Sequence, residues 1–277
     1  MKEKIICGRI KSLPAVLFCL VVLLQFTSSA SLSAKEGQIK IGVLATRGVE
    51  QCMKSWGATA DHLTEHIPGK TFVIVPLAHD QIAPSVRRGE VDFLLTNSSF
   101  YVELEQQYGI DRIATLKEMR LGRPYSKYGS VIFSRSTRDD IRALADLKSK
   151  SFMGVSEDSF GGWRMTLREL KENGIDPYRD FTSLLFGETH DNVVYAVRDG
   201  VVDAGTVRTN TLEELSAEGK INLADFYVFP KLHDLDQQTP YLVTTREYPN
   251  WPMAKMKNTP DELAEIDKTD RFWTFWQ

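Results

Sequence analysis

The sequence predicts an α/β protein of two lobes, each with a mainly parallel β-sheet covered by helices. Short apolar runs alternate with helical stretches from about residue 39 onward, which is typical of parallel sheets with crossover helices. Hydroxyl, amide or glycine residues follow several of the apolar runs, as at strand ends that lead into helices. The chain length suits two such sheets better than one very wide sheet.

The N-terminal segment predicts a secretory signal peptide. Basic residues from Lys2 to Lys11 precede an apolar run at 13–26, and Ser28 and Ala30 supply the small residues of a cleavage site. The apolar run is too short for a membrane-spanning helix. We therefore expect cleavage after Ala30, so that residues 1–30 form the leader, and export to the periplasm; an uncleaved anchor is the alternative.

Charge and cysteine content exclude several functions. The full chain carries a formal net charge of −3, and removal of the leader, with its four Lys/Arg and one Glu, takes it to −6. A net acidic protein is not a nucleic-acid binder held by phosphate electrostatics, so local donors must hold any anionic ligand. Cys52 is the one cysteine outside the leader, which excludes an intrachain disulfide and a cysteine-rich zinc site.

The first half of the chain alternates between predicted strands and helices. Strands are expected at 39–45, 71–75, 91–95, 113–116 and 130–134. Met53, Trp56, Ala60, Leu63 and Ile67 are spaced by three and four residues, which predicts a helix with one apolar face. Further helices are expected at 81–88, from 99 to 108, and at 137–147.

The second half repeats this alternation. Strands are expected at 152–155, 183–186, 201–207, 226–229 and 241–244, and helices from 163 to 173 and at 190–199. Thr211 and Glu214 form a capping box that opens another helix. We assign residues 35–125 to the first lobe, 126–240 to the second, and 241–277 to a return to the first lobe.

Four strand-to-helix loops, 46–48, 96–99, 156–162 and 206–211, are the candidate ligand site. Ligands of open α/β sheets lie beyond the carboxyl ends of the strands, where helix N-termini offer free N–H groups to an oxyanion. The candidate ligand-binding residues are Thr46, Arg47, Thr96, Asn97, Ser98, Ser99, Tyr101, Ser156, Ser159, Phe160, Gly161, Gly162, Trp163, His190, Thr206, Arg208 and Thr209.

Individual candidates carry different expected roles. Arg208 is the best charged clamp for an anion and Arg47 a weaker second one, although Arg208 could instead pair with Glu213 or Glu214. Trp163 is expected to form an apolar wall of the site, the alternative being a core tryptophan. Ser159 is expected to cap the following helix and also to offer its hydroxyl group.

One motif indicates a different function. His62, Glu65 and His66 match the H-x-x-E-H pattern of some zinc peptidases. Short motifs of this kind arise by chance, and the two histidines flank the apolar face of their helix towards solvent. We expect no catalytic residue, no metal and no cofactor, and we keep the zinc hydrolase as a minor alternative.

Several segments together resemble a known family. Residues 187–191, the apolar run 193–197 and the segment 200–205 are similar to the second-lobe signature of phosphonate-binding periplasmic solute-binding proteins. The resemblance covers about residues 39–265. A narrower resemblance, to periplasmic sensory domains of histidine kinases of the tetrathionate-sensor type, lies in residues 96–97, 101–105, 159–163, 205–209 and 248–252.

The resemblance implies the type II periplasmic-binding-protein fold, with a small anion held in a cleft between lobes that close on it. Phosphonates, phosphate, sulfonates and thionates are the implied ligands, and an ABC permease or a membrane sensor kinase is the implied partner. Transport and sensing both stay open, and we expect a monomer. The ending at 267–277, with Phe272 and Trp276 among its aromatic residues, indicates a truncated or frameshifted gene product, the alternative being a natural short ending whose aromatic residues pack on the first lobe.

Overall fold

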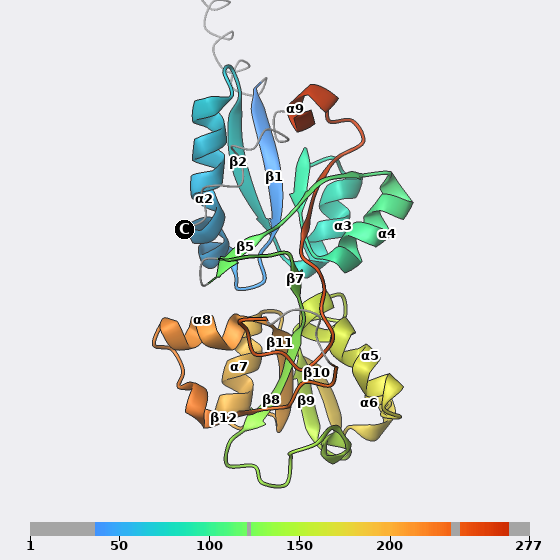
Figure 1. The fold of residues 1–277 in the computed structure, drawn as a ribbon. Helices are drawn as coiled ribbons and strands as arrows, with labels where there is room; N and C mark the ends of the chain where they lie inside the picture. The colour runs from blue at the N-terminus through green and yellow to red at the C-terminus, as the bar shows by residue number, and fades with distance from the viewer. Residues whose placement is uncertain (1–36, 121–122, 234–238, 266–277) are drawn as a thin grey trace, which may run out of the picture. The chain divides into compact units, whose positions relative to one another are not determined.

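The first of two five-stranded sheets has the strand order β2-β1-β3-β14-β4 (Figure 1). The computed structural model describes residues 37–120, 123–233 and 239–265, so the expected leader and C-terminal ending lie outside the described residues. The strands are β1 (Gln38–Leu44), β2 (Thr71–Leu77), β3 (Phe93–Leu95), β4 (Asp111–Thr115) and β14 (Pro252–Lys255). β1 runs parallel to β3, whereas β14 runs antiparallel to both β3 and β4.

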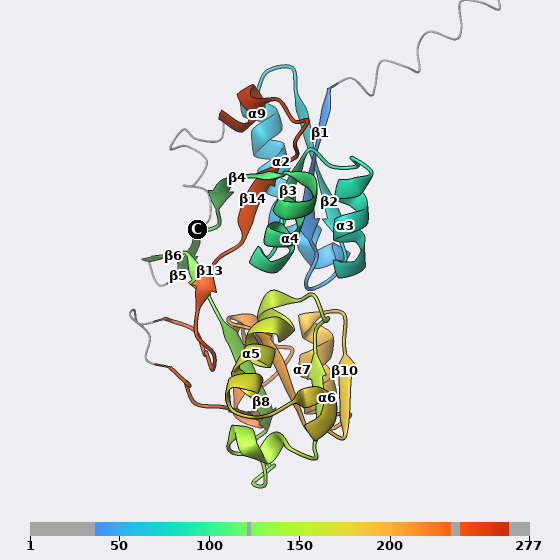
Figure 2. The same ribbon diagram turned by 90° about the vertical axis from the view of Figure 1, so that its right-hand side faces the viewer.

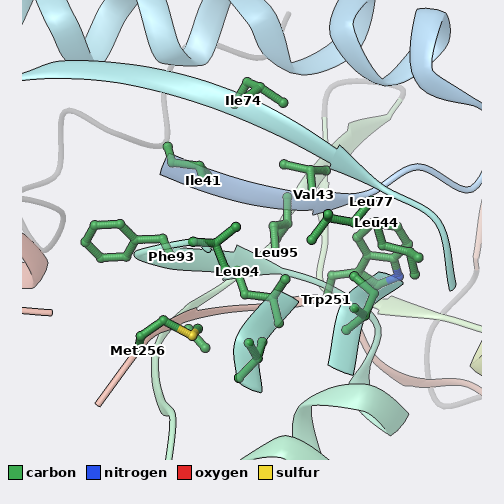
Figure 3. Close-up of a cluster of buried hydrophobic side chains, with 14 of the residues drawn as sticks. Ile41, Val43, Leu44, Ile74, Leu77, Phe93, Leu94, Leu95, Trp251 and Met256 are labelled. Atoms are coloured by element: carbon green, nitrogen blue, oxygen red, sulfur yellow. The ribbon is translucent and has the colours of Figure 1, made fainter. Parts of the chain in front are cut away.

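Helices cover both faces of this sheet. We call the sheet together with these helices the first lobe. Helix α2 (Val49–His66) lies on one face, and α3 (His79–Arg87) and α4 (Ser98–Tyr108) lie on the other (Figure 1). The core of this lobe is mainly aliphatic with some phenylalanine, such as Phe93, and Trp251 extends it at the ends of the strands, beside Leu44 (Figure 3).

The second sheet, with the order β10-β9-β11-β8-β12, forms the second lobe. Its strands are β8 (Ser130–Arg135), β9 (Ser151–Gly154), β10 (Ser183–Phe186), β11 (Ala204–Arg208) and β12 (Phe226–Val228). β9 is parallel to β10 and β11, and β8 is antiparallel to β11 and β12. Neighbouring β8 residues face opposite cores: Val131 and Phe133 join one cluster, and Ile132 joins the other.

The helices of the second lobe complete these two cores. α7 (His190–Arg198) and α8 (Thr211–Ala217) cover one face. The π-helical turn η2 (Phe160–Arg164) and α5 (Met165–Glu172) cover the other, followed by α6 (Pro177–Asp180). Two 3-10 turns, η1 (Leu144–Leu147) and η3 (Leu223–Asp225), lie in the connections.

Short strands join the two sheets. After β4 the chain forms the hairpin of β5 (Glu118–Arg120) and β6 (Arg123–Tyr125), and then β7 (Lys127–Tyr128) leads into β8. The chain returns through β13 (Tyr248–Pro249), which pairs antiparallel with β7, and continues into β14 and α9 (Asp261–Glu265) (Figure 2). The two crossings therefore run side by side. Within the described residues, no helix is both long and apolar enough to cross a membrane.

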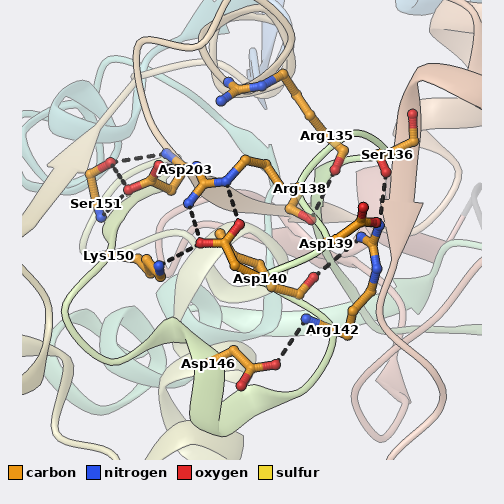
Figure 4. Close-up of polar contacts among 12 residues, drawn as sticks. Arg135, Ser136, Arg138, Asp139, Asp140, Arg142, Asp146, Lys150, Ser151 and Asp203 are labelled. Carbon is orange, nitrogen blue, oxygen red and sulfur yellow. Dashed lines mark hydrogen bonds and ion pairs between the residues drawn. The ribbon is translucent and has the colours of Figure 1, made fainter.

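The α/β fold of the type II binding proteins is confirmed, but several element predictions are wrong. The expected helix at 137–147 is a turn followed by η1, because side chains bind the backbone there: the Asp146 carboxylate accepts from the N–H groups of Arg142 and Ala143, and Arg142 donates to the Ser136 carbonyl (Figure 4). The expected strand at 241–244 is irregular, and β14 was missed. Each sheet is mixed, with antiparallel strands beside the parallel ones.

The expected capping box at Thr211 is also wrong. The N-cap of α8 is Asn210, which adopts the left-handed conformation with φ 73°. Its amide donates to the Glu214 carboxylate at 2.6 Å. Asparagine tolerates this conformation better than most residues, so it takes the position where the strand turns sharply into the helix.

Candidate functional site

A cavity of about 550 Å³ lies at the strand ends of both lobes. The first lobe contributes the turn between β1 and α2, the first turns of α2 and Trp251, and the second lobe contributes His190 and the segment from Arg208 through α8. The start of β5 and Tyr241 complete the lining. This volume is that of a small-molecule site, and a ligand here would touch both lobes.

Arg208 is the last residue of β11 and lines this cavity. One of its terminal nitrogens donates to the Glu118 carboxylate and to Asn250 Oδ1 at 3.2 Å. The guanidinium carbon lies 4.7 Å from the ring centre of Tyr128 and 5.7 Å from that of Trp251. Burial would lower the pKa of Arg208, but the Glu118 carboxylate raises it above its usual value, so the group is a permanent cation.

Buried donors around Arg208 have no protein partner among the described residues. They are Nε of Arg208, Nε1 of Trp251 and the hydroxyl of Tyr128, the last two lying near one another without a hydrogen bond of good geometry. Burial raises the pKa of the Tyr128 phenol, so it keeps its proton at neutral pH. A buried polar group without a partner costs about 1–3 kcal/mol, which makes this cluster unfavourable unless an acceptor can reach it.

His190 adds a further donor to the cavity lining. It opens α7 after the Thr189 cap, and its Nδ1 accepts the backbone N–H of Arg208 at 3.2 Å. Burial lowers the pKa of His190 well below its usual value. The ring is therefore neutral, and because Nδ1 is an acceptor, the proton resides on Nε2. The His190 backbone N–H also donates to the Thr46 carbonyl of the first lobe at 3.0 Å.

Arg47, in the turn between β1 and α2, is fully engaged by carboxylates of the second lobe. It binds Asp191 through Nε and Nη2 at 2.7 and 3.0 Å, and Glu218 through Nη1 and Nη2 at 2.9 and 2.8 Å. Nη1 also donates to Glu214 at 3.2 Å. These contacts use all five N–H donors of the guanidinium. Arg47 thus ties the lobes together.

Nine of the predicted site residues line one of two cavities. Thr46, Arg47, His190, Arg208 and Thr209 line the cavity described above. A second cavity of about 580 Å³ is lined by four others, namely Ser98, Ser99, Tyr101 and Phe160. In this second cavity the Ser99 hydroxyl accepts from Arg164 of the second lobe, and the Tyr101 hydroxyl donates to Glu105.

The remaining predicted residues line neither cavity. They are Thr96, Asn97, Ser156, Ser159, Gly161, Gly162, Trp163 and Thr206. Asn97 caps α4 by accepting from Phe100 N–H, and Ser159 caps η2 by accepting from Gly162 N–H. The Thr206 hydroxyl shares a buried hydrogen bond with Thr166 at 2.7 Å.

Trp163 and the glycine pair Gly161 and Gly162 pack against other side chains in the interior. Trp163 is fully buried against Phe152 and Phe186, which is the packing that the core-tryptophan alternative expects. A Cβ atom on Gly161 would lie 2.8 Å from the Tyr128 ring. Glycine here lets η2 approach Tyr128 and Arg208, which is a different use from presenting N–H groups to a ligand.

Sequence reasoning missed three residues that line the cavity around Arg208, namely Glu118, Tyr241 and Trp251, and two that contact Arg208 from outside the cavity lining, Tyr128 and Asn250. Asn250 and Trp251 belong to the segment 248–252. That segment contributed to the family resemblance, but none of its residues was predicted to bind the ligand. Glu118 starts a three-residue strand and has no local pattern that marks it.

The zinc motif lies on one side of α2. The His62 and His66 ring centres are 3.9 Å apart, and His66 Nδ1 contacts the His62 carbonyl at 2.8 Å. Within residues 37–120, 123–233 and 239–265, no three His, Cys, Asp or Glu side chains are grouped so that they could hold a metal ion.

Comparisons with known proteins agree with this architecture. The family described as "ABC transporter, phosphonate, periplasmic substrate-binding protein" matches residues 41–266. The chain is 34% identical over 233 residues to the tetrathionate sensor histidine kinase TtrS of Salmonella typhimurium. That match covers 83% of this chain but 38% of the kinase.

Solved structures show the same fold at lower identity. PhnD1 from Prochlorococcus marinus, in complex with methylphosphonate, has a TM-score of 0.67 at 16% identity over 82% of this chain and 79% of that one. A binding-protein component of an ABC phosphonate transporter from Pseudomonas aeruginosa has a TM-score of 0.68 at 16% identity over 86% and 76%. The chain therefore belongs to the family of periplasmic phosphonate-type substrate-binding proteins, which bind their substrates and are not enzymes.

Proposed function

We propose that this protein captures a small oxyanion in the cavity around Arg208 and releases it unchanged. The observation that carries the proposal is the convergence of a permanent cation with uncommitted donors, from Arg208, Tyr128 and Trp251, beside the neutral His190. A net acidic chain attracts anions poorly over long distances, so such a cluster has to supply the affinity.

The comparisons support thionates as the first ligands to test. The relative at 34% identity is named a tetrathionate sensor, whereas the methylphosphonate-bound neighbour shares 16% identity. Both ligands expose terminal oxygen atoms with negative charge, which guanidinium, indole and phenol donors can bind. Phosphonates, phosphate and sulfonates are the second group.

Both lobes contribute to the cavity, which supports binding by lobe closure about the β7 and β13 crossings. The basic and apolar N-terminal segment supports export through a cleavable leader. The protein would then meet its ligand in the periplasm.

The output of binding has two candidates. Delivery to an ABC permease is favoured by the family match, and signalling to a membrane sensor kinase is favoured by the 34% identity to TtrS. Neighbouring genes for a permease and an ATPase would support uptake, whereas a kinase and a response regulator would support sensing.

A thermal-shift screen tests the proposed function. Tetrathionate, thiosulfate, methylphosphonate, phosphate and a simple sulfonate are compared at one ionic strength. A ligand at about 100 times its Kd stabilises the folded state by about 2.7 kcal/mol, which raises Tm clearly. We expect at least one oxyanion to do so in the wild type and none in Arg208→Ala, and no shift with any of them would contradict the proposal.

A further inference from the structure

We propose that Glu118 is an internal competitor for the anion site: its carboxylate occupies Arg208, and a bound oxyanion displaces it. The inference rests on the proposed function and deepens it, because it assigns to Glu118 the selection among anions.

Glu118 is held as a ligand anion would be held. Its Oε1 accepts from Arg208 and from Asn250 Nδ2 at 3.2 Å, and its Oε2 accepts from the Tyr241 hydroxyl at 3.3 Å. The donors come from three separate segments: the end of β11, the turn before β14, and the chain that follows β12. A guanidinium, an amide and a phenol around one carboxylate are the donor set that recognises a small oxyanion.

The two anions cannot share Arg208 without a large electrostatic cost. Burial would raise the pKa of Glu118, but Arg208 holds it below its usual value, so the carboxylate is charged at neutral pH. A second anion within about 4 Å in such a poorly solvated place is strongly repelled. Oxyanion binding at Arg208 therefore requires that Glu118 leaves.

The uncommitted donors indicate why a ligand can win this competition. Glu118 leaves Arg208 Nε and Trp251 Nε1 without partners among the described residues. A larger oxyanion with several terminal oxygens can accept from these groups as well as from the terminal nitrogens of Arg208. A simple monocarboxylate offers no more than Glu118 already does, so Glu118 should exclude carboxylates from the site.

The variant Glu118→Gln tests this role, because it removes the charge with little change in shape. Affinities for tetrathionate, methylphosphonate and acetate are measured by calorimetry at one pH and salt concentration. We expect the variant to bind tetrathionate or methylphosphonate, whichever binds the wild type, about tenfold more tightly or better. The reason is that the ligand no longer has to break one charge-assisted hydrogen bond between Glu118 and Arg208. Acetate binding should become measurable. Glu90→Gln is the matched control, because Glu90 pairs with Arg88 on the exposed surface and should leave every affinity unchanged.

The outcomes separate the inference from the proposed function. If the wild type binds an oxyanion and folded Glu118→Gln binds it equally or more weakly, Glu118 is not a competitor and the proposed function stands. If neither protein binds any probe, both proposals fail. Should Glu118→Gln not fold, Tyr241→Phe removes one donor to Glu118; a smaller gain in affinity supports the inference, and an unchanged or reduced affinity overturns it.

Discussion

Arg47 and Arg208 line the same cavity, yet their surroundings differ sharply. Arg47 directs all five N–H donors to three carboxylates of the opposite lobe. Among the residues that the structure describes, Arg208 pairs with one carboxylate and keeps an N–H group without a protein partner. The contrast shows that an arginine at a strand end is not in itself an anion site: the number of donors still uncommitted decides whether it can bind a ligand or joins two parts of the chain.

The largest expected effect is on the Arg208 side. Arg208→Ala should weaken oxyanion binding about 100-fold or more, because it removes the charge and at least one charge-assisted hydrogen bond. It also leaves Glu118 buried without its cation, which destabilises the fold. The double variant with Glu118→Gln should recover stability but not binding, as measured by calorimetry and denaturant unfolding. Recovery of binding in the double variant would place the site elsewhere.

Arg47→Ala should mainly weaken the contact between the two lobes and affect ligand affinity less. The variant removes the cation that binds Asp191, Glu214 and Glu218 from the first lobe, and Lys220, which also pairs with Asp191 and Glu218, lies in the second lobe, so the lobes separate more readily. We expect a larger radius of gyration by small-angle X-ray scattering, and an oxyanion affinity reduced less than about tenfold, because these partly exposed pairs are screened by salt. A loss of affinity as large as that of Arg208→Ala would erase the distinction between the two arginines.

The buried histidines make the Arg208 side sensitive to acid. Burial lowers the pKa of His79 to about 4 and that of His190 well below its usual value. Both stay neutral in the folded protein, whereas the unfolded chain takes up protons below about pH 6.5. Stability should therefore be constant above that pH and fall between about 6.5 and 4, by about 2 kcal/mol for His79 between pH 7 and 5.

Urea unfolding at these two pH values measures the loss. His79→Leu should remove its share of the pH dependence. If the free energy of unfolding changes with pH equally in the wild type and the variant, His79 has an ordinary pKa in the folded protein.

The smallest expected effect concerns Cys52, which lines the cavity at α2 on the Arg47 side. Burial raises the pKa of its thiol to about 11, so about one molecule in a thousand carries the thiolate at pH 8. A thiolate attacks a central sulfur of tetrathionate and displaces thiosulfate, so the low thiolate fraction of Cys52 makes this reaction slow. We therefore expect reversible binding with no covalent adduct in intact-mass spectra after an hour. A stoichiometric adduct would mean that the thiol is activated.

The sequence predicted the two lobes because strand and helix periodicity is a local property. It also located Arg208, His190 and Arg47 at strand-to-helix turns, and the structure brings these three to one cavity. The hydroxyl residues at 96–99 and 156–162 are a different case. In these two loops Asn97 caps α4 and Ser159 caps η2, and capping and ligand binding favour the same residue types.

Glu118, Tyr128 and Trp251 could not be predicted in the same way. Each reaches Arg208 through the crossings between the sheets, and such long-range contacts leave no periodic mark in the sequence. The ion-pair partners of Arg47 could not be predicted from the sequence either, because they depend on which helices of the second lobe face the turn after β1.

The most direct test of the account is a crystal structure of the protein with tetrathionate. We expect the sulfonate oxygens of the anion within hydrogen-bond distance of the Arg208 guanidinium, with Glu118 turned away and Arg47 still bound to Asp191 and Glu218. An anion bound at Arg47 or outside this cavity, with the Glu118–Arg208 pair intact, would contradict it.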